Sequence, residues 1–177
     1  AAAGGVGSLA SQWGKHLGGR VIGVVSTPEK AELALRNGCE HVVLADDDVP
    51  ARVRELTAGD GVAAVYDSVG KDTFFASLDC LRPHGVMVTF GNASGPVEPF
   101  APAELAKRHS LYVTRPVLFD FVGTRESLLQ ASSELFDVIA GGAVNVSVNQ
   151  RFALQDAARA HIDLESRKTI GSTILQP

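Results

Sequence analysis

The first eight residues, AAAGGVGS, combine small side chains at a spacing that suits the binding of a dinucleotide. Gly4 and Gly7 stand at the last two positions of a G-x-G-x-x-G pattern, and Ala2 replaces its first glycine. Residues without a Cβ let a pyrophosphate approach the backbone, and a helix that starts here presents free N–H groups. Because four strand and helix repeats follow, the pattern favours a dinucleotide-binding turn over a flexible tail of small residues.

Ser26 and Lys30 indicate which dinucleotide this turn would receive. A site for NAD needs an aspartate or glutamate about 20 residues after the glycines, where it binds the ribose 2′-hydroxyl. Ser26 occupies that position, and Lys30 follows it by four residues. A hydroxyl and an ammonium suit a 2′-phosphate, which a carboxylate would repel, so the pair favours NADP. Two alternatives stay open: Glu29 supplies the missing acid, or Ser26 and Lys30 are an ordinary turn residue and a solvated helix residue.

Glycine and polar residues also follow two later predicted strands, as DSVG at residues 67–70 and FGN at residues 90–92. Ligands of open parallel sheets bind beyond the carboxyl ends of the strands, so both segments would border ribose and nicotinamide. Ordinary strand-to-helix turns are the alternative for each. Asp67 has no nucleophile or histidine near it in the sequence, and we assign no catalytic residue.

The elements that would position these residues alternate between short apolar strands and capped helices. Strands are expected at residues 20–26, 41–45, 61–70, 85–91 and 111–116, and helices at 6–17, 28–38, 49–59, 71–83 and 124–142. A longer connection with about one helical turn spans 92–110. A strand at 143–154, a helix at 153–166 and a strand at 171–177 complete the chain. This alternation predicts an α/β fold with a Rossmann-type doubly wound parallel sheet.

Composition excludes several other classes of function. The net charge of −4 without a basic stripe argues against nucleic acid, and no run of about 18 apolar residues predicts a membrane span. We expect a cytoplasmic protein with Cys39 and Cys80 buried as packing residues. The five histidines lack the spacing of zinc ligands, and the run Asp46 to Asp48 reads as a solvated loop, so no metal site is predicted.

Several strings carry a resemblance to a known family: AAAGGVGS, VYDSVG, SLDCL, FGNASGPV, SLYVTRP and ESRKTIGS. They resemble the cofactor-binding half of the quinone oxidoreductases, the ζ-crystallin-like, zinc-free group of the medium-chain dehydrogenase/reductase superfamily. The resemblance covers nearly the whole chain. It implies hydride transfer from NADPH to a quinone, and an enone or enoyl reductase of the same superfamily or a non-catalytic NADPH-binding module are the alternatives.

The resemblance also implies a set of cofactor contacts. The glycine turn matches the family at Ala1, Gly4 and Gly7, with the pyrophosphate against the backbone of Gly5 and Val6. Ser26 and Lys30 match its 2′-phosphate pocket, although Ala45 replaces a tyrosine often found after the third strand of the family. The residues matching the ribose and nicotinamide side are Ser68, Val69, Gly70, Phe90, Gly91, Asn92, Val113, Arg115 and Arg167.

The family further implies two domains and a homodimer. Residues 1–142 would form the NADP-binding domain, without its first strand, and residues 143–177 would return to a catalytic domain that precedes the glycine turn. Edge strand 111–116 would pair with its copy in a second molecule. These expectations make the chain a fragment that is inactive on its own.

Overall fold

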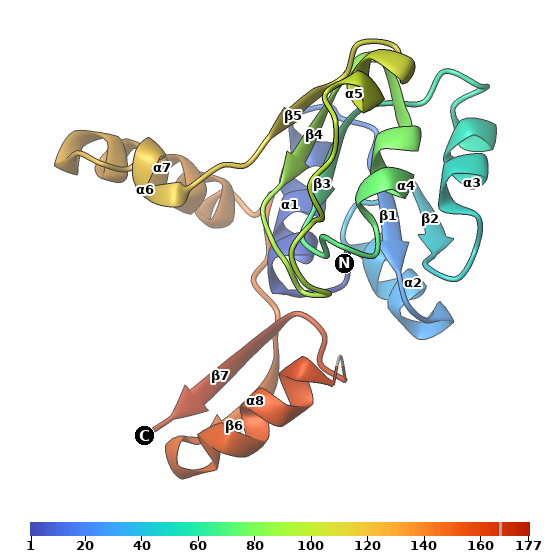
Figure 1. Ribbon diagram of the computed structural model, residues 1–177. Coiled ribbons are helices and arrows are strands. Elements are labelled where there is room, and N and C mark those ends of the chain that lie inside the picture. The colour runs from blue at the N-terminus through green and yellow to red at the C-terminus, as the bar shows by residue number, and fades with distance from the viewer. Residues whose placement is uncertain (167) are drawn as a thin grey trace. The chain divides into compact units, whose positions relative to one another are not determined.

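Helices and strands alternate along the chain in the computed structural model, which describes residues 1–166 and 168–177 (Figure 1). The strands within each sheet are parallel. This confirms the predicted α/β class. The chain divides into two compact units, Ala1–Leu44 with Ser132–Pro177, and Ala45–Ala131.

The first unit begins with two helix and strand repeats. Its elements are α1 (Gly5–His16), β1 (Ile22–Val25), α2 (Pro28–Arg36) and β2 (His41–Leu44), and β1 pairs with β2 in parallel. Thr27 caps α2 and Pro28 takes its first turn, as the sequence predicted. Ala3, Val25, Ala34 and Cys39 form the buried core of this part.

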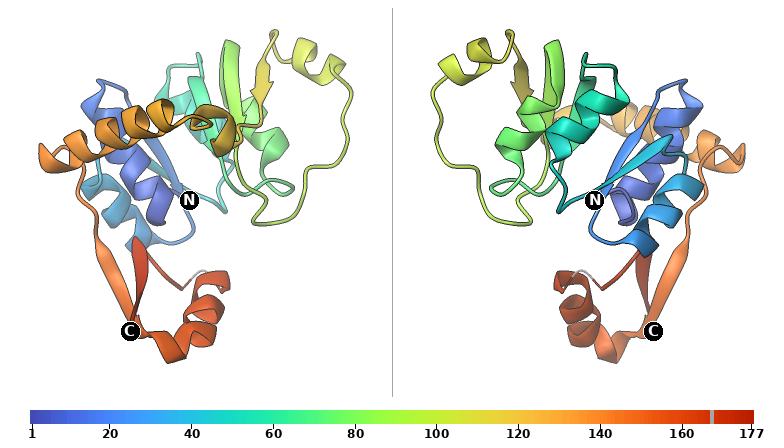
Figure 2. Two further views of the ribbon diagram at one scale, coloured as in Figure 1. Left: turned by 90° about the vertical axis from the view of Figure 1, so that its left-hand side faces the viewer. Right: turned by 90° about the vertical axis from the view of Figure 1, so that its right-hand side faces the viewer.

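The C-terminal part of the first unit contains two strands with a helix between them. β6 (Val148–Ala153) pairs in parallel with β7 (Ser172–Gln176), and a short 3₁₀ turn and α8 (Ala157–Glu165) connect the two (Figure 2). The segment joins the glycine turn through a bridge between Gly4 and Gly171, where the Gly171 N–H donates to the Ala3 carbonyl at 2.9 Å. The glycine turn therefore has a long-range partner from the other end of the chain.

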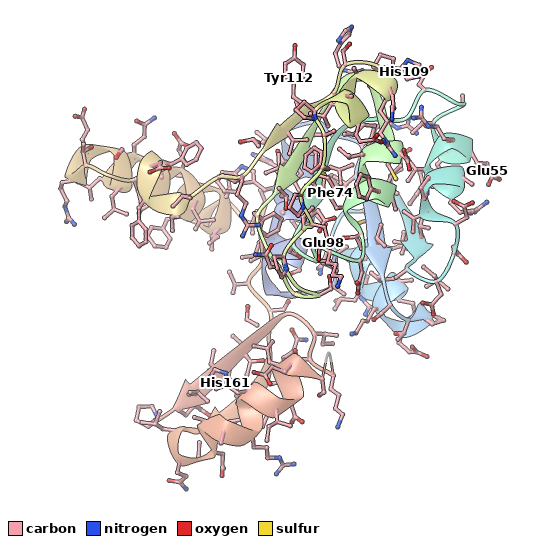
Figure 3. The ribbon with its side chains drawn as sticks, in the orientation of Figure 1. Glu55, Phe74, Glu98, His109, Tyr112 and His161 are labelled. Atoms are coloured by element: carbon pink, nitrogen blue, oxygen red, sulfur yellow. The ribbon has the colours of Figure 1, made fainter. Side chains whose placement is uncertain are left out.

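The second unit is built on a three-stranded parallel sheet in the order β3, β4, β5. Its elements are α3 (Val49–Leu56), β3 (Val62–Asp67), α4 (Phe74–Asp79), β4 (Leu81–Thr89), α5 (Ala103–Lys107), β5 (Tyr112–Thr114) and α6 (Leu118–Phe121). Phe74, Leu78, Leu81, Met87 and Leu111 form its core, and Phe74 is labelled in Figure 3. This core holds α4 against the sheet.

The longest helix, α7 (Arg125–Ala140), begins in the second unit and ends in the first. Thr124 caps it by accepting a hydrogen bond from the Ser127 N–H at 3.1 Å, as predicted. It buries none of its residues fully, and Leu129 and Phe136 are 52% and 64% exposed. Among the described residues, no helix is long and apolar enough to cross a membrane.

Two sequence predictions were wrong in detail. The helix expected at residues 71–83 ends at Asp79, and residues 81–84 belong to β4. The strand starts early because Leu81 pairs with Val62 and the Val62 N–H donates to the Cys80 carbonyl, contacts that local sequence does not contain. Likewise, the strand expected from residue 143 begins only at Val148.

β1 and β2 form a sheet of the first unit, and β3, β4 and β5 form a sheet of the second. In the first unit, the Ala2 N–H donates to the Val24 carbonyl at 3.1 Å, so the glycine turn lies beside β1.

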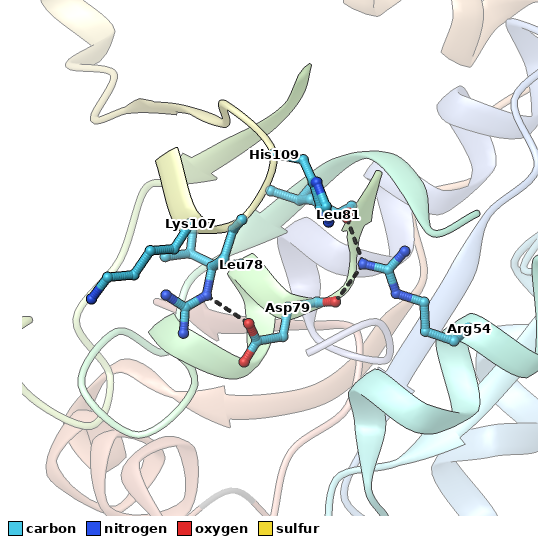
Figure 4. A pocket seen from close by; sticks show the side chains of 7 residues that line it. Arg54, Leu78, Asp79, Leu81, Lys107 and His109 are labelled. Atoms are coloured by element: carbon cyan, nitrogen blue, oxygen red, sulfur yellow. Dashed lines mark hydrogen bonds and ion pairs between the residues drawn. The ribbon is translucent and has the colours of Figure 1, made fainter. Parts of the chain in front are cut away.

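Arg54 connects several backbone segments near the amino ends of β3 and β4. Its guanidinium donates to the carbonyls of Gly59, Asp60, Asp79 and Leu81 at 2.8–3.1 Å, two of these bonds being drawn in Figure 4. It borders a hollow of about 220 Å³ whose other cations, Lys107 and Arg108, are paired with carboxylates. Arg54 therefore satisfies carbonyls of the turn between α3 and β3 and of the junction between α4 and β4.

We expect Arg54→Lys to destabilise the protein by about 1–3 kcal/mol, because one ammonium cannot reach four carbonyls as the planar guanidinium does. Chemical unfolding would measure the change. The matched control is Arg52→Lys on the same helix, since Glu55 is the one partner that the described residues offer the Arg52 side chain. Equal effects of the two substitutions would contradict the role of Arg54.

Gly7 packs closely against the residues that precede α1. A Cβ at Gly7 would clash with the Ala1 carbonyl and lie 2.9 Å from Cα of Ala2. We expect Gly7→Ala to lower stability by roughly 1–3 kcal/mol, measured by thermal unfolding. Gly14→Ala in the same helix is the control: its Cβ meets only a side-chain carbon of Val21, at 3.2 Å, so stability should stay or rise.

Candidate cofactor site

The N-terminus of α1 leaves backbone donors available to an anion. Gly4 is its N-cap, no side chain caps the helix, and the first turn carries no acidic residue. The N–H groups of a first helical turn have no partner within the helix. Across residues 1–166 and 168–177, no acceptor is described for those of Gly5, Val6 and Gly7. An anion placed here would also meet the positive end of the helix dipole.

The structure brings Ser26 and Lys30 together at the end of β1. Lys30 Nζ donates to Ser26 Oγ at 3.3 Å. Ser26 is exposed just beyond the strand, and Lys30 lies in the first turn of α2, where Thr27 receives its N–H. The Ser26 hydroxyl and the Lys30 ammonium therefore lie next to each other at the start of α2. This pair of groups suits a phosphate.

Glu29, the acid that could have replaced the missing aspartate or glutamate, accepts hydrogen bonds from groups at the start of α2. Hydrogen bonds from its own backbone N–H and then from the Thr27 side chain lower the pKa of Glu29. Its carboxylate therefore serves as a helix-terminal acceptor, as is common in a first turn. Ala45 is exposed after β2 and offers no aromatic ring there.

The carboxyl ends of three parallel strands form a lip in the second unit. Asp67 of β3 pairs with Thr89 of β4, and Val88 pairs with Thr114 of β5. The residues predicted for the ribose and nicotinamide side that follow these ends are Ser68, Val69, Gly70, Phe90, Gly91, Asn92 and Arg115. Val113 lies within β5, one residue before its end, and pairs with Met87. Sequence reasoning thus selected residues that the fold brings to one edge.

Backbone hydrogen bonds join the two loops of the lip, residues 68–71 and 92–95. The Ala93 and Ser94 N–H groups donate to the carbonyls of Ser68 and Val69 at 3.2 and 2.8 Å. The Lys71 N–H donates to the Gly95 carbonyl at 3.1 Å. The loops therefore form one layer rather than two independent turns.

Two glycines make this close approach possible. Gly70 has a φ of +90°, which favours glycine, and a Cβ there would lie 2.7 Å from the Gly95 carbonyl. A Cβ at Gly91 would overlap the backbone of Ser68. Larger residues at these positions would separate the loops.

Arg115 connects the end of β5 to the same edge. Its Nη1 donates to the Thr89 carbonyl at 3.2 Å and the Gly91 carbonyl at 3.1 Å. The Arg115 guanidinium, which follows β5, thus holds the backbone at the end of the neighbouring strand β4. Arg167, the remaining predicted contact, lies outside the described residues.

Sequence reasoning placed Asp67 in the segment that borders the cofactor and assigned its side chain no catalytic role. Asp67 is 5% exposed, and its carboxylate accepts from the Val69 and Gly70 N–H groups and the Thr73 and Ser77 hydroxyls. An aspartate followed at short spacing by glycine and by Thr and Ser of the next helix is the signal that could have indicated this network.

The remaining candidate groups have structural partners. Cys39 and Cys80 are buried as predicted, and burial raises the pKa of Cys80 to about 11. Asp48 caps α3 by accepting from the Ala51 N–H at 3.1 Å. In the described part of the chain, no group of three or more His, Cys, Asp and Glu side chains is arranged to hold a metal ion.

Comparison with known proteins agrees with this arrangement. A family model for zinc-binding dehydrogenases matches residues 5–135. The quinone oxidoreductase of Pseudomonas aeruginosa is 52% identical over the whole chain, and the chain spans 55% of that relative's length. A 2-haloacrylate reductase of Burkholderia is 46% identical over the whole chain and 54% of its own length.

A solved structure shares the fold closely. The crystal structure of Escherichia coli quinone oxidoreductase complexed with NADPH is 50% identical, with a TM-score of 0.96 over 100% of this chain and 55% of that one. The match agrees with the Rossmann-type arrangement of helices and parallel strands. The chain therefore belongs to the zinc-binding dehydrogenase family, and its relatives include quinone oxidoreductases that are 50% and 52% identical to it.

Proposed function

We propose that this chain is the cofactor-binding part of an oxidoreductase that transfers hydride from NADPH to a quinone. The observation that carries the proposal is the contact between Lys30 and Ser26, at the position where an NAD site would need an acid. Support for the quinone comes from relatives at about 50% identity that are quinone oxidoreductases, one of them solved with NADPH.

In this proposal, separate groups of residues contact different parts of the cofactor. The free N–H groups of Gly5 and Val6 would bind the pyrophosphate, with Gly4 and Gly7 keeping the turn open. Ser26 and Lys30 would bind the 2′-phosphate. Residues 68–70, residues 90–92, Val113 and Arg115 would border the ribose and nicotinamide, together with Arg167.

The chain's residues would orient the cofactor rather than take part in proton or covalent chemistry. When bound, NADPH supplies the hydride. The lip would fix the ring, and correct orientation alone can lower the barrier by several kcal/mol. We propose no side chain of this chain as a general acid, base or nucleophile, and no metal in the reaction.

A second candidate function is reduction of an activated double bond. This second function is favoured by the 2-haloacrylate reductase, which is 46% identical over the whole length of this chain. Quinones and enones are both conjugated carbonyl compounds that accept hydride. The two candidates therefore differ only in the acceptor.

We further propose that residues 143–177 contact a separate catalytic domain and that strand 111–116 pairs with its copy in a homodimer. Among the described residues, β5 pairs with a strand on one side only, and an edge of this kind can pair with another strand. A two-fold axis beside this edge would let two copies satisfy one another.

We expect Lys30→Glu to weaken NADPH binding about tenfold or more and to leave NADH binding within about threefold, because a carboxylate repels only the 2′-phosphate. Titration of nicotinamide fluorescence in the full-length protein measures both affinities. Arg151→Glu on β6 makes the same charge change on an exposed side chain and should alter neither affinity. Equal weakening of NADPH and NADH by Lys30→Glu would contradict a 2′-phosphate contact.

We expect the full-length protein to oxidise NADPH when a 1,4-quinone is added, faster than with an enone of similar size. Loss of NADPH absorbance measures the rate, and a metal chelator should leave it unchanged. The 177-residue chain alone should give no turnover, because a second domain would form the wall around the acceptor. Turnover by the chain alone would sink the two-domain proposal, and a faster enone reaction would favour the second candidate.

A further inference from the structure

The carboxylate of Asp67 ties the end of β3 to the loop that follows it. Oδ1 accepts from the Val69 N–H at 2.6 Å and from the Gly70 N–H at 3.0 Å. Oδ2 accepts from the Thr73 hydroxyl at 2.6 Å and the Ser77 hydroxyl at 2.8 Å. The Asp67 carbonyl also receives the Phe90 N–H at 2.8 Å. One residue therefore contacts the first loop of the lip, the residue that follows β4, and α4.

These bonds set the direction of the peptide groups in the lip. With the N–H groups of Val69 and Gly70 turned toward Asp67, the carbonyls of Ser68 and Val69 meet the N–H groups of Ala93 and Ser94. The Ser94 hydroxyl adds a bond to the Val69 carbonyl at 2.9 Å. The second loop is thus held by the first, and the first by Asp67.

Several hydrogen-bond donors converge on the position of the Asp67 side chain. A carboxylate suits this position because all of its lone pairs can accept hydrogen bonds. Asp67 is 5% exposed, and no salt bridge involves it in the part of the chain that the structure describes. Hydrogen bonds to an ionised acceptor are stronger than neutral ones. Four such donors compensate for the burial of the charge.

The same geometry argues against Asp67 as a general base. Both oxygens already accept two hydrogen bonds each, and the side chain is buried beneath the loop rather than exposed on it. A proton acceptor has to come within hydrogen-bond reach of the reacting group. The contacts instead fit a residue that acts through the backbone of its neighbours.

We propose that Asp67 is a positioning residue for the nicotinamide end of the cofactor, acting through the backbone of residues 68–70 and 92–95. The inference rests on the proposed function and deepens it. In consequence, the α1 turn and the Ser26–Lys30 pair would bind the adenosine end of the cofactor independently of Asp67. Loss of the carboxylate should therefore affect one end of the cofactor and spare the other.

The experiment compares Asp67→Ala and Asp67→Asn in the full-length protein with two probes. NADPH contains both ends of the cofactor, whereas adenosine 2′,5′-bisphosphate contains only the adenosine end. Asparagine keeps an oxygen for the Val69 and Gly70 N–H groups, and its amide can donate to the hydroxyls of Thr73 and Ser77, which can rotate. Thr73 has a second acceptor in the Gly70 carbonyl at 3.4 Å.

A matched control separates positioning from general loss of stability. Thr57→Ala removes a half-buried hydroxyl that donates to the Val53 carbonyl at 2.7 Å and accepts from the Gly61 N–H at 2.9 Å. Thr57 precedes β3, whereas Asp67 ends it. The control therefore loosens the same unit at the other end of the same strand and should leave both affinities unchanged.

We expect Asp67→Ala to weaken NADPH binding about tenfold and to change binding of adenosine 2′,5′-bisphosphate less than about twofold, while Asp67→Asn stays within about threefold of wild type for both. If the alanine variant does not fold, Ser77→Ala removes a single donor and should weaken NADPH binding alone. Equal loss of both ligands in either variant, or no loss, overturns the role of Asp67. Failure of the wild-type protein to bind NADPH overturns the proposed function itself.

Discussion

Buried polar groups need hydrogen-bond partners, and this constraint decides the shape of both ends of the β3–β5 sheet. At the carboxyl ends of the strands, the Asp67 carboxylate is satisfied by the loop that follows it and by α4, and the carbonyls of Ser68 and Val69 are satisfied when the two loops lie together. At the amino ends, the Arg54 guanidinium satisfies carbonyls of the turn before β3 and of the junction between α4 and β4. The parallel register between the strands keeps these two sets of contacts at opposite ends of the sheet.

The helices of the first unit meet the same constraint in two ways. α2 starts with Thr27, whose hydroxyl accepts a backbone N–H, and so satisfies its own end. α1 starts with Gly4 and has no side-chain cap. Within the described residues, no acceptor is found for the N–H groups of Gly5, Val6 and Gly7, and Gly7 packs closely on the residues that precede the helix. A helix end of this kind suits an anion.

The differences between expectation and structure have one physical origin. The pattern KDTFFASLDCLRP reads as a helix through Pro83, yet the chain leaves the helix at Asp79, because Leu81 and Cys80 pair with Val62 across the sheet. The sequence placed Asp67 in the segment expected at the cofactor but indicated no role for its carboxylate, because its neighbours in sequence contain no catalytic partner. Its donors include Thr73 and Ser77, whose hydroxyls come within reach only after α4 folds back over the sheet.

Local patterns in the sequence determined the α/β class, the helix starts at Thr27 and Thr124, the glycine turn and the choice of Ser26 and Lys30, because these depend on residues within a few positions of one another. The resemblance carried by strings such as VYDSVG and FGNASGPV indicated which residues would border a cofactor. Only the tertiary structure decided that residues 68–71 and 92–95 form one layer and that Asp67 and Arg54 hold the two ends of the unit. Those hydrogen bonds join residues far apart in sequence, and local periodicity contains no information about such partners.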